Sequence, residues 1–235
     1  MNPEHVLAVC LGGVLCFTPL AVYLYTLARI TRRDRPTVVS GPWDFAGVVL
    51  GLSGFVLFGG GLVLSVLQSN FRYATRGNRE AFRGAWEREG ETWVVFAAAY
   101  LALVLGVVVL TLLARRRSLV VYNIDPAAFE ATAAEVFEHL GRPVERRGNL
   151  WHAAGVPLFE LDRFVAGQTV TLRWVSDDVR LFQEAERLLR EAVRHVDADD
   201  QSVASRWLMA CSGGLGFWAL CCFGLLLVYA FSGGR

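Results

Sequence analysis

Histidines and closely spaced carboxylates are the residues of this chain whose types could do chemistry. His195 precedes Asp197, Asp199 and Asp200 in the stretch HVDADD, and neighbouring carboxylates can bind a hard cation such as Ca²⁺. A site of this kind needs about six or more oxygen ligands held in a defined loop, which this stretch does not offer. We therefore expect a solvated hinge here and predict no metal site.

The remaining candidates for catalysis are scattered along the sequence. His139 and His152 stand in different predicted elements, and Asp44 with His5 is the one pairing near the end of an apolar segment. The sequence pattern contains no Ser-His-Asp order, no glycine-rich phosphate loop and no paired carboxylates of the kind that enzymes bury. We expect no catalytic residue, no bound cofactor and no enzymatic activity.

The five cysteines do not follow a metal-binding or disulfide pattern. Zinc sites and disulfide frameworks use regularly spaced cysteines in polar segments, whereas no Cys-x-x-Cys pair occurs in this chain. A thiol within an apolar run behaves as a small hydrophobic side chain. All five lie in such runs: Cys10, Cys16, Cys211, Cys221 and Cys222. We expect neither zinc nor disulfides.

The composition indicates a membrane protein. Of the 235 residues 54% are apolar, and the mean hydropathy of +0.40 is high for a soluble domain of this length. Four apolar stretches reach the roughly 20 residues that a helix needs to cross a bilayer. They are residues 6–28, 45–67, 93–113 and 207–231. The first is predicted to be retained and not cleaved as a signal peptide, because MNPEH carries no Lys or Arg before it.

Arginines near the helix ends predict how these four helices are oriented. With the N-terminus outside, the inner ends carry Arg29, Arg32, Arg33, Arg35, Arg115, Arg116, Arg117 and Arg206. The opposite orientation would place Arg72, Arg76, Arg79, Arg83, Arg88 and Arg235 inside, where they are fewer and spread among glutamates. We therefore expect a multi-pass protein of a bacterial inner membrane, with both termini outside and residues 118–205 in the cytoplasm.

The second helix carries glycines on one face. Gly47, Gly51, Gly54 and Gly61 follow spacings of four, three and seven, which align them so that a neighbouring backbone can approach closely. We expect this face to pack against another helix, in the same chain or in a homo-oligomer. None of the four helices has an ionisable residue near its middle, which counts against an ion or substrate path through them.

The start of the second helix carries a resemblance. Asp44, beside Pro42 and Trp43, is expected to cap the helix while Trp43 anchors it at the bilayer surface. The stretch SGPWDFAGVVLGLSGFVLFGGG, from Ser40 to Gly61, resembles uncharacterised multi-pass membrane proteins of planctomycete-type bacteria. The resemblance covers this stretch only and is carried by Gly41, Pro42, Trp43, Asp44, Phe45, Ser53, Gly54, Phe55, Gly59 and Gly60. It implies a membrane location and no known activity.

The segment from Ser69 to Thr92 is rich in arginine and aromatic residues. Phe82 and Trp86 are four residues apart, so a short helix could lay both rings into the bilayer interface with arginines toward the phosphates. Glutamates are interleaved with these arginines, so we expect a solvated or headgroup-facing surface and no specific site. Nucleic-acid binding is not supported.

Residues 118–205 have the composition of one small globular domain. SLVVYNI predicts a strand, and Asp125 followed by Pro126 predicts the start of a helix. That helix is expected to end at Gly141 and to bury one stripe of its surface. The stripe consists of Phe129, Ala133, Val136, Phe137 and Leu140.

The second half of this domain predicts strands and a further helix. Turns at Gly148 and Asn149, near Gly155 and around Gly167 separate short alternating segments, one of which places Val170, Leu172 and Trp174 on the same side. A helix then runs from Asp177 or Asp178 to about Val196, with an apolar stripe of Val179, Phe182, Leu189, Val193 and Val196. The predicted fold is a two-layer α+β domain in the order strand, helix, three or four antiparallel strands, helix.

The predicted protein has membrane helices in residues 1–117, the α+β domain in residues 118–205 and the last membrane helix in residues 206–235. We expect a non-enzymatic membrane protein whose cytoplasmic domain binds a protein partner or senses a state. A rearrangement in this domain is expected to pull on the two membrane helices that are joined to it through Arg117 and Arg206. The alternative is a subunit of an oligomeric transporter or channel, and a membrane enzyme is the third hypothesis. The expected partners are the lipid bilayer, a protein bound by residues 118–205, or a second copy of the chain.

Overall fold

The computed structural model of the chain describes residues 3–33, 35–67, 79–196 and 202–232. Asp197, Asp199, Asp200 and residues 69–78 of the arginine-rich segment lie outside the described residues. The chain divides into two compact units. The helix unit comprises Met1–Tyr25, Val48–Leu110 and Ala210–Arg235, and the sheet unit comprises Thr26–Gly47 and Thr111–Met209.

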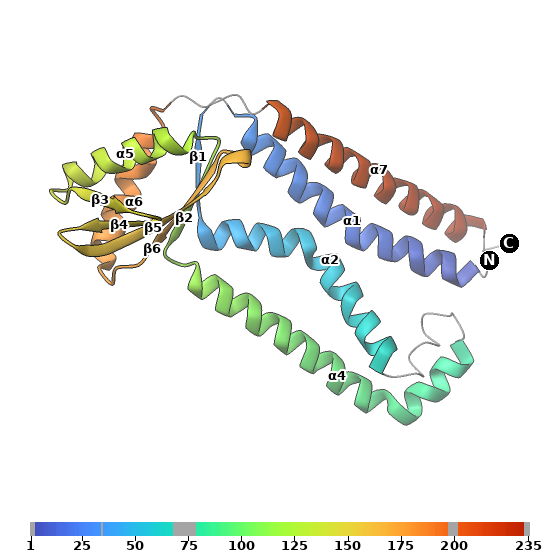
Figure 1. The fold of residues 1–235 in the computed structure, drawn as a ribbon. Coiled ribbons are helices and arrows are strands. Elements are labelled where there is room, and N and C mark those ends of the chain that lie inside the picture. Colours follow the sequence, from blue (N-terminus) through green and yellow to red (C-terminus); the bar gives the residue numbers. More distant parts are fainter. Residues whose placement is uncertain (1–2, 34, 68–78, 197–201, 233–235) are drawn as a thin grey trace. The chain divides into compact units, whose positions relative to one another are not determined.

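Four long apolar helices are present, as predicted. They are α1 (Pro3–Thr31), α2 (Gly41–Leu67), α4 (Arg79–Ala114) and α7 (Ser202–Ser232) (Figure 1). Each is long and apolar enough to cross a membrane. The short helix expected around Phe82 and Trp86 is continuous with the third apolar stretch, because no proline or turn separates the two, and Figure 1 shows that α4 bends along its length.

Glycines of α2 allow a close approach to α1 inside the helix unit. A Cβ atom at Gly51 would lie 2.8 Å from Cβ of Tyr23, and one at Gly54 would lie 2.0 Å from the backbone oxygen of Leu15. Gly61 does not share this contact, because a Cβ there would meet no atom within 4 Å. Gly47 falls in the sheet unit. Of the predicted four-glycine face, Gly51 and Gly54 contact α1 and Gly61 does not.

The opposite end of α2 contacts α4 through a different glycine. A Cβ at Gly60 would lie 2.8 Å from the ring of Tyr100. The Tyr100 hydroxyl donates a hydrogen bond of 2.8 Å to the backbone oxygen of Val56. Gly60, and not Gly61, therefore makes room for a neighbouring helix in this part of α2.

The sheet unit contains one antiparallel sheet of six strands in the order β1-β2-β6-β5-β4-β3. Its strands are β1 (Thr37–Ser40), β2 (Ser118–Tyr122), β3 (Val144–Arg147), β4 (Leu150–Ala153), β5 (Val156–Phe164) and β6 (Thr169–Trp174). The helices α5 (Pro126–His139) and α6 (Val179–Val193) follow β2 and β6, and the 3-10 helix η2 (Val165–Gly167) joins β5 to β6. The predicted order is confirmed, with four strands between the two helices.

Strand β1 was not predicted from the sequence. It comes from the link between α1 and α2 and pairs with β2, with Thr37 opposite Tyr122 and Ser40 opposite Leu119. Residues 118–205 alone therefore do not make the whole sheet. The next residue after β1, Gly41, begins α2, and a Cβ there would lie 1.8 Å from the Ser118 hydroxyl. Only glycine fits where the chain turns from β1 into α2.

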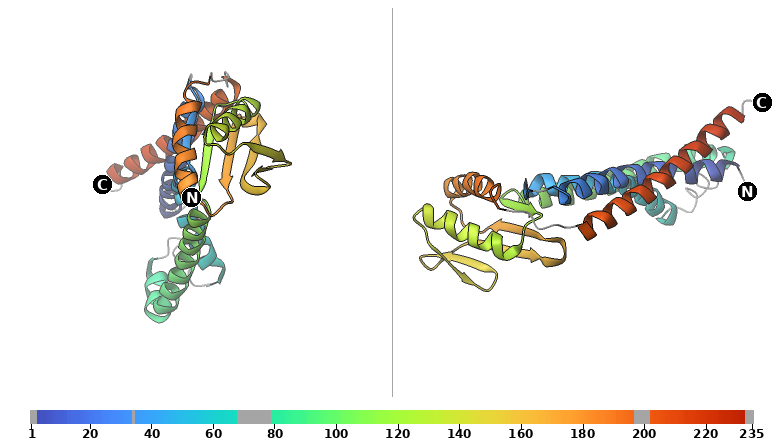
Figure 2. Two further views of the ribbon diagram at one scale, coloured as in Figure 1. Left: turned by 90° about the vertical axis from the view of Figure 1, so that its left-hand side faces the viewer. Right: turned by 90° about the horizontal axis from the view of Figure 1, so that it is seen from above.

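Helices α5 and α6 cover one face of the sheet (Figures 1 and 2). Val170, Leu172 and Trp174 are buried on this face, as predicted. At the centre of the core, Phe137 of α5 stacks on Phe159 of β5 with ring centroids 4.8 Å apart. Close packing of aromatic side chains from both layers stabilises the two-layer arrangement.

Capping side chains set the starts of both helices. The Asp125 carboxylate accepts a hydrogen bond of 3.0 Å from the Ala128 amide, with Pro126 at the first helical position, as predicted. Asp178 caps α6 by accepting a hydrogen bond of 3.0 Å from the Leu181 amide. The expected burial of Val179 was wrong, since it is 44% exposed. Because α6 starts at this residue, the buried stripe is Leu181, Phe182, Ala185, Leu189 and Val193.

Candidate functional site

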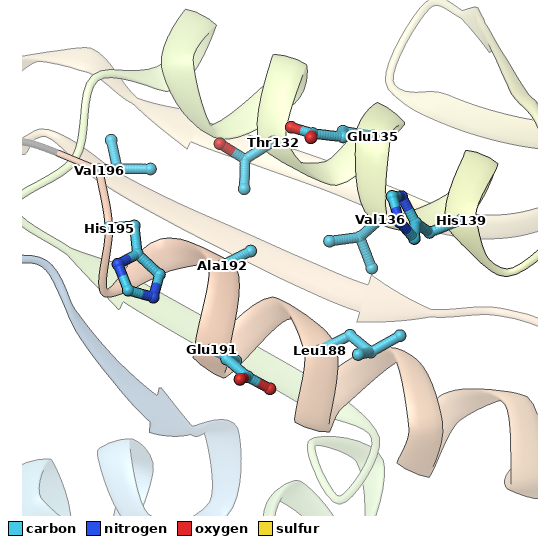
Figure 3. A pocket seen from close by; sticks show the side chains of 9 residues that line it. All are labelled: Thr132, Glu135, Val136, His139, Leu188, Glu191, Ala192, His195 and Val196. Carbon is cyan, nitrogen blue, oxygen red and sulfur yellow. The ribbon is translucent and has the colours of Figure 1, made fainter.

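A groove of about 500 Å³ runs between α5 and α6 on the sheet unit (Figure 3). The two helices run antiparallel, so that the start of α5 lies beside the end of α6. Nine residues line the groove: Thr132, Glu135, Val136, His139, Leu188, Glu191, Ala192, His195 and Val196. The groove is a candidate site because it combines apolar and ionisable side chains on rigid elements.

The floor of the groove is apolar. Val136 and Ala192 turn toward the gap between the helices in Figure 3, and Leu188 and Val196 extend this apolar surface. On α6, Leu188 and Ala192 lie next to the stripe that packs on the sheet and are partly buried. Val136 of α5 is buried. A partly buried apolar strip between two helices is a surface into which the apolar face of a third helix can fit.

The rims of the groove are acidic. Glu135 of α5 and Glu191 of α6 are both exposed and stand on opposite sides of the gap in Figure 3. His139 and His195, which the sequence left in separate elements, line the same groove. Among the residues that the structure describes, no three His, Cys, Asp or Glu side chains lie close enough to hold a metal ion. The arrangement suits an apolar segment flanked by basic residues.

The third candidate histidine lies elsewhere. His152 of β4 pairs across the sheet with Glu145 of β3 and lines a separate depression of about 600 Å³ with Arg142 and Arg147. The Arg147 guanidinium lies 3.7 Å from the Glu145 carboxylate, and both side chains are largely exposed. The structure therefore does not bring the three histidines of this domain together.

Helix α6 connects the groove to the edge of the sheet. Arg190 donates a hydrogen bond of 2.9 Å to the backbone oxygen of Val38 in β1. Glu186, one turn earlier, holds the same guanidinium through bonds of 2.7 and 3.1 Å. Since Leu188 and Ala192 line the groove and Arg190 lies between them in sequence, one helix contacts both the groove and β1.

A polar junction fastens the start of α2 to the sheet. The Tyr122 hydroxyl donates a hydrogen bond to Oδ1 of Asp44. Oδ2 of Asp44 lies 3.9 Å from the Arg115 guanidinium, and this guanidinium stands 5.3 Å from the ring centre of Phe45. The predicted capping role of Asp44 was wrong, because α2 begins three residues earlier at Gly41. Trp43, the expected interfacial anchor, is 76% exposed.

Two further contacts join the sheet to the neighbouring segments. The Asn123 side chain donates a hydrogen bond of 2.5 Å to the backbone oxygen of Arg33, just after α1. Arg117, after α4, lies 3.5 Å from the carboxylate of Asp177. The arginines expected to act only as orientation signals thus include two, Arg115 and Arg117, that pair with carboxylates. Arg32, Arg33, Arg35 and Arg116 are exposed.

Replacing Tyr122 with phenylalanine is expected to loosen the junction. The change leaves the ring in place but removes the donor to Asp44, whose side chain is 16% exposed. A hydrogen bond to a charged acceptor contributes about 1.5–3 kcal/mol, and partial exposure puts the expected loss near 1–2 kcal/mol. The urea midpoint of the detergent-solubilised chain measures it. Tyr229→Phe in α7 removes the same hydroxyl outside the junction, and an equal midpoint shift in both variants would refute the role of Tyr122.

The contacts that make these sites could not be predicted from the sequence. Arg190 and Glu186 are four residues apart on a strongly amphipathic helix, which signals an ion pair but not its bond to β1. Nothing in the sequence pattern singles out Glu135 and Glu191. No protein-family model matches the chain, and the comparisons with curated proteins and with solved structures found no match.

Proposed function

We propose that this chain is a non-enzymatic, multi-pass membrane protein whose α+β domain binds a protein partner in the groove between α5 and α6. The partner segment is an amphipathic helix whose apolar face meets Val136, Leu188 and Ala192 and whose basic residues meet Glu135 and Glu191. An apolar floor supports affinity, and the two acidic rims support orientation and selectivity.

The distribution of arginines supports a cytoplasmic location for this domain. All the arginines that the sequence assigns to the inner side belong to the sheet unit. The same unit includes one end of each apolar helix, at residues 26–31, 41–47, 111–114 and 202–209. Basic residues at the ends of membrane helices favour the cytoplasmic side.

The observation that carries the proposal is the position of α6. One side of this helix lines the groove, while Arg190 holds the backbone of β1 at a distance of 2.9 Å. Strand β1 leads directly into α2 and begins shortly after α1. A partner that shifts α6 would therefore act on β1 and on the helix ends joined to it. Binding and the state of the helices would be coupled through this strand.

Site-specific photocrosslinking in native membranes tests the groove. A benzophenone side chain at position 192 lies in the groove, whereas one at Gln183 is exposed on another side of α6. We expect a discrete adduct with another protein from position 192 and none from position 183. The same adducts from both positions, or none from either, would count against a partner in this groove.

An arginine in the groove is expected to prevent binding without unfolding the domain. Ala192→Arg fills part of the apolar floor and reverses the charge that the rims present, and a rejected binding segment lowers the yield of the adduct at least tenfold. Gln183→Arg adds the same side chain outside the groove and serves as the matched control. For this comparison the photocrosslinker is placed at Thr132, on the α5 side of the groove. An undiminished adduct in Ala192→Arg would show that the groove is not the binding surface.

A further inference from the structure

The loop between β5 and β6 exposes two adjacent apolar side chains. Phe164, the last residue of β5, is 64% exposed, and Val165, the first residue of η2, is 70% exposed. Both belong to the sheet unit. Most of the large apolar side chains of this unit are buried in one core between the sheet and the helices α5 and α6. A neighbouring phenylalanine and valine left outside that core call for a surface to contact.

Hydrogen bonds place this loop beside the end of α1. The Gln168 amide donates to the backbone oxygen of Val165 at 3.1 Å, and the Ile124 amide donates to the backbone oxygen of Gln168 at 3.2 Å. The preceding residue, Asn123, holds the backbone oxygen of Arg33. The loop is thus tied in two steps to a residue close to the end of α1.

The end of α1 is also the end of a candidate membrane span. The apolar window of α1 runs to Thr31, two residues before the Arg33 oxygen that Asn123 holds. The interfacial region on each side of the hydrocarbon is several ångströms thick, since the whole bilayer measures about 40–45 Å against about 30 Å for its core. In a bilayer that α1 crosses up to Thr31, a loop fastened this near to Arg33 would lie at the depth of the headgroups.

The charges around this loop fit a headgroup surface. Arg29, Arg32, Arg33 and Arg35 are all exposed at the end of α1 and in the link to β1. Exposed arginines beside an aromatic and an aliphatic side chain are the combination that binds the interface of an anionic bilayer, with the cations at the phosphates and the apolar groups below them.

We propose that Phe164 and Val165 insert into the interface of the bilayer that α1 crosses, and so hold the sheet against the membrane at the end of β5. The partner of this surface is lipid, and the loop is a third kind of attachment beside the chain connections and the Asp44 junction. The inference rests on the membrane location of the proposed function, but not on a partner in the groove.

The test compares the two ends of one strand in the full-length chain. Val156 begins β5 and is 58% exposed, so it matches Val165 in type and exposure. Strand β5 spans about 26 Å from Val156 to Phe164, the residue before Val165. A genetically encoded coumarin side chain at position 165 or 156 leaves the five cysteines in place. The labelled chains are reconstituted into nanodiscs of phosphatidylcholine and phosphatidylglycerol with and without lipids that carry a shallow nitroxide.

Quenching by the shallow nitroxide is expected at position 165 to be at least threefold stronger than at position 156. Equal quenching at both positions, or none at 165, would overturn the proposal. A chain that does not enter nanodiscs at all would instead argue against the membrane location.

A second measurement guards against a disturbed label site. Benzophenone at position 165, irradiated in native membranes, should add the mass of a phospholipid to the protein, whereas benzophenone at position 156 should not. Adducts with protein in place of lipid at position 165 would overturn the assignment to the bilayer.

Discussion

Gly54→Ala is expected to destabilise the packing of α1 against α2 by about 3 kcal/mol, the upper end of the usual range for overpacking. The added Cβ would lie 2.0 Å from the backbone oxygen of Leu15 and 2.6 Å from Cα of Cys16. Both obstructing atoms belong to the backbone, so no side-chain rotation can relieve the clash. The two helices must separate or rotate, and either movement gives up the contacts around Gly51.

Unfolding by SDS in mixed micelles measures this loss, and a second glycine of the same helix provides the control. A Cβ at Gly61 would meet no atom within 4 Å, and alanine is the better helix former by about 1 kcal/mol. Gly61→Ala should therefore leave the SDS midpoint unchanged or raise it, while Gly54→Ala lowers it. Equal midpoints for the two variants would mean that α1 and α2 do not pack through Gly54.

The elements of this fold that could be predicted are those with local signals. Each apolar helix is marked by composition alone, and α5 by a capping carboxylate, a following proline and a terminal glycine within one segment. Gly141 has a φ of +67°, the conformation that glycine adopts most easily at the end of a helix. The alternation of apolar and polar residues in β6 is also a local signal, and it correctly predicted the burial of Val170, Leu172 and Trp174.

The features that escaped prediction depend on partners far away in sequence. Strand β1 has only four residues, so no alternation can be recognised in it, although the β-branched run of Thr37, Val38 and Val39 was a signal. Asp44 and Tyr122 are 78 residues apart, and capping is the role that local reasoning gives an aspartate at the start of a helix. The groove required knowing that α5 and α6 are neighbours, which no periodicity within either helix specifies.

The contacts of β1 explain why this unpredicted strand matters for the proposed function. It is an edge strand, and Arg190 binds the backbone oxygen of Val38 there. A bound guanidinium both protects an edge from pairing with another chain and joins it to α6. The strand that links two apolar helices is therefore also the strand that the groove helix contacts.

Phe159→Ala is expected to reduce the free energy of unfolding of the sheet unit by about 3–5 kcal/mol, as other deletions of a buried phenylalanine ring do. The ring is fully buried, with ring centroids of Phe137 at 4.8 Å, Trp151 at 5.6 Å and Trp174 at 6.3 Å. Its removal leaves a cavity between the two layers that these large, rigid neighbours cannot fill. Urea unfolding followed by tryptophan fluorescence measures the change, because Trp151 and Trp174 report on this core.

Phe164→Ala separates the loss of packing at Phe159 from a general effect of shortening a phenylalanine in β5. Phe164 is five residues further along the same strand and 64% exposed, so its truncation in detergent should change the free energy of unfolding by less than about 0.5 kcal/mol. The same variant should weaken attachment to lipid if the loop inserts. Stability and membrane contact would then reside at opposite faces and different positions of one strand. A large loss of stability in Phe164→Ala would show instead that its side chain packs within the domain.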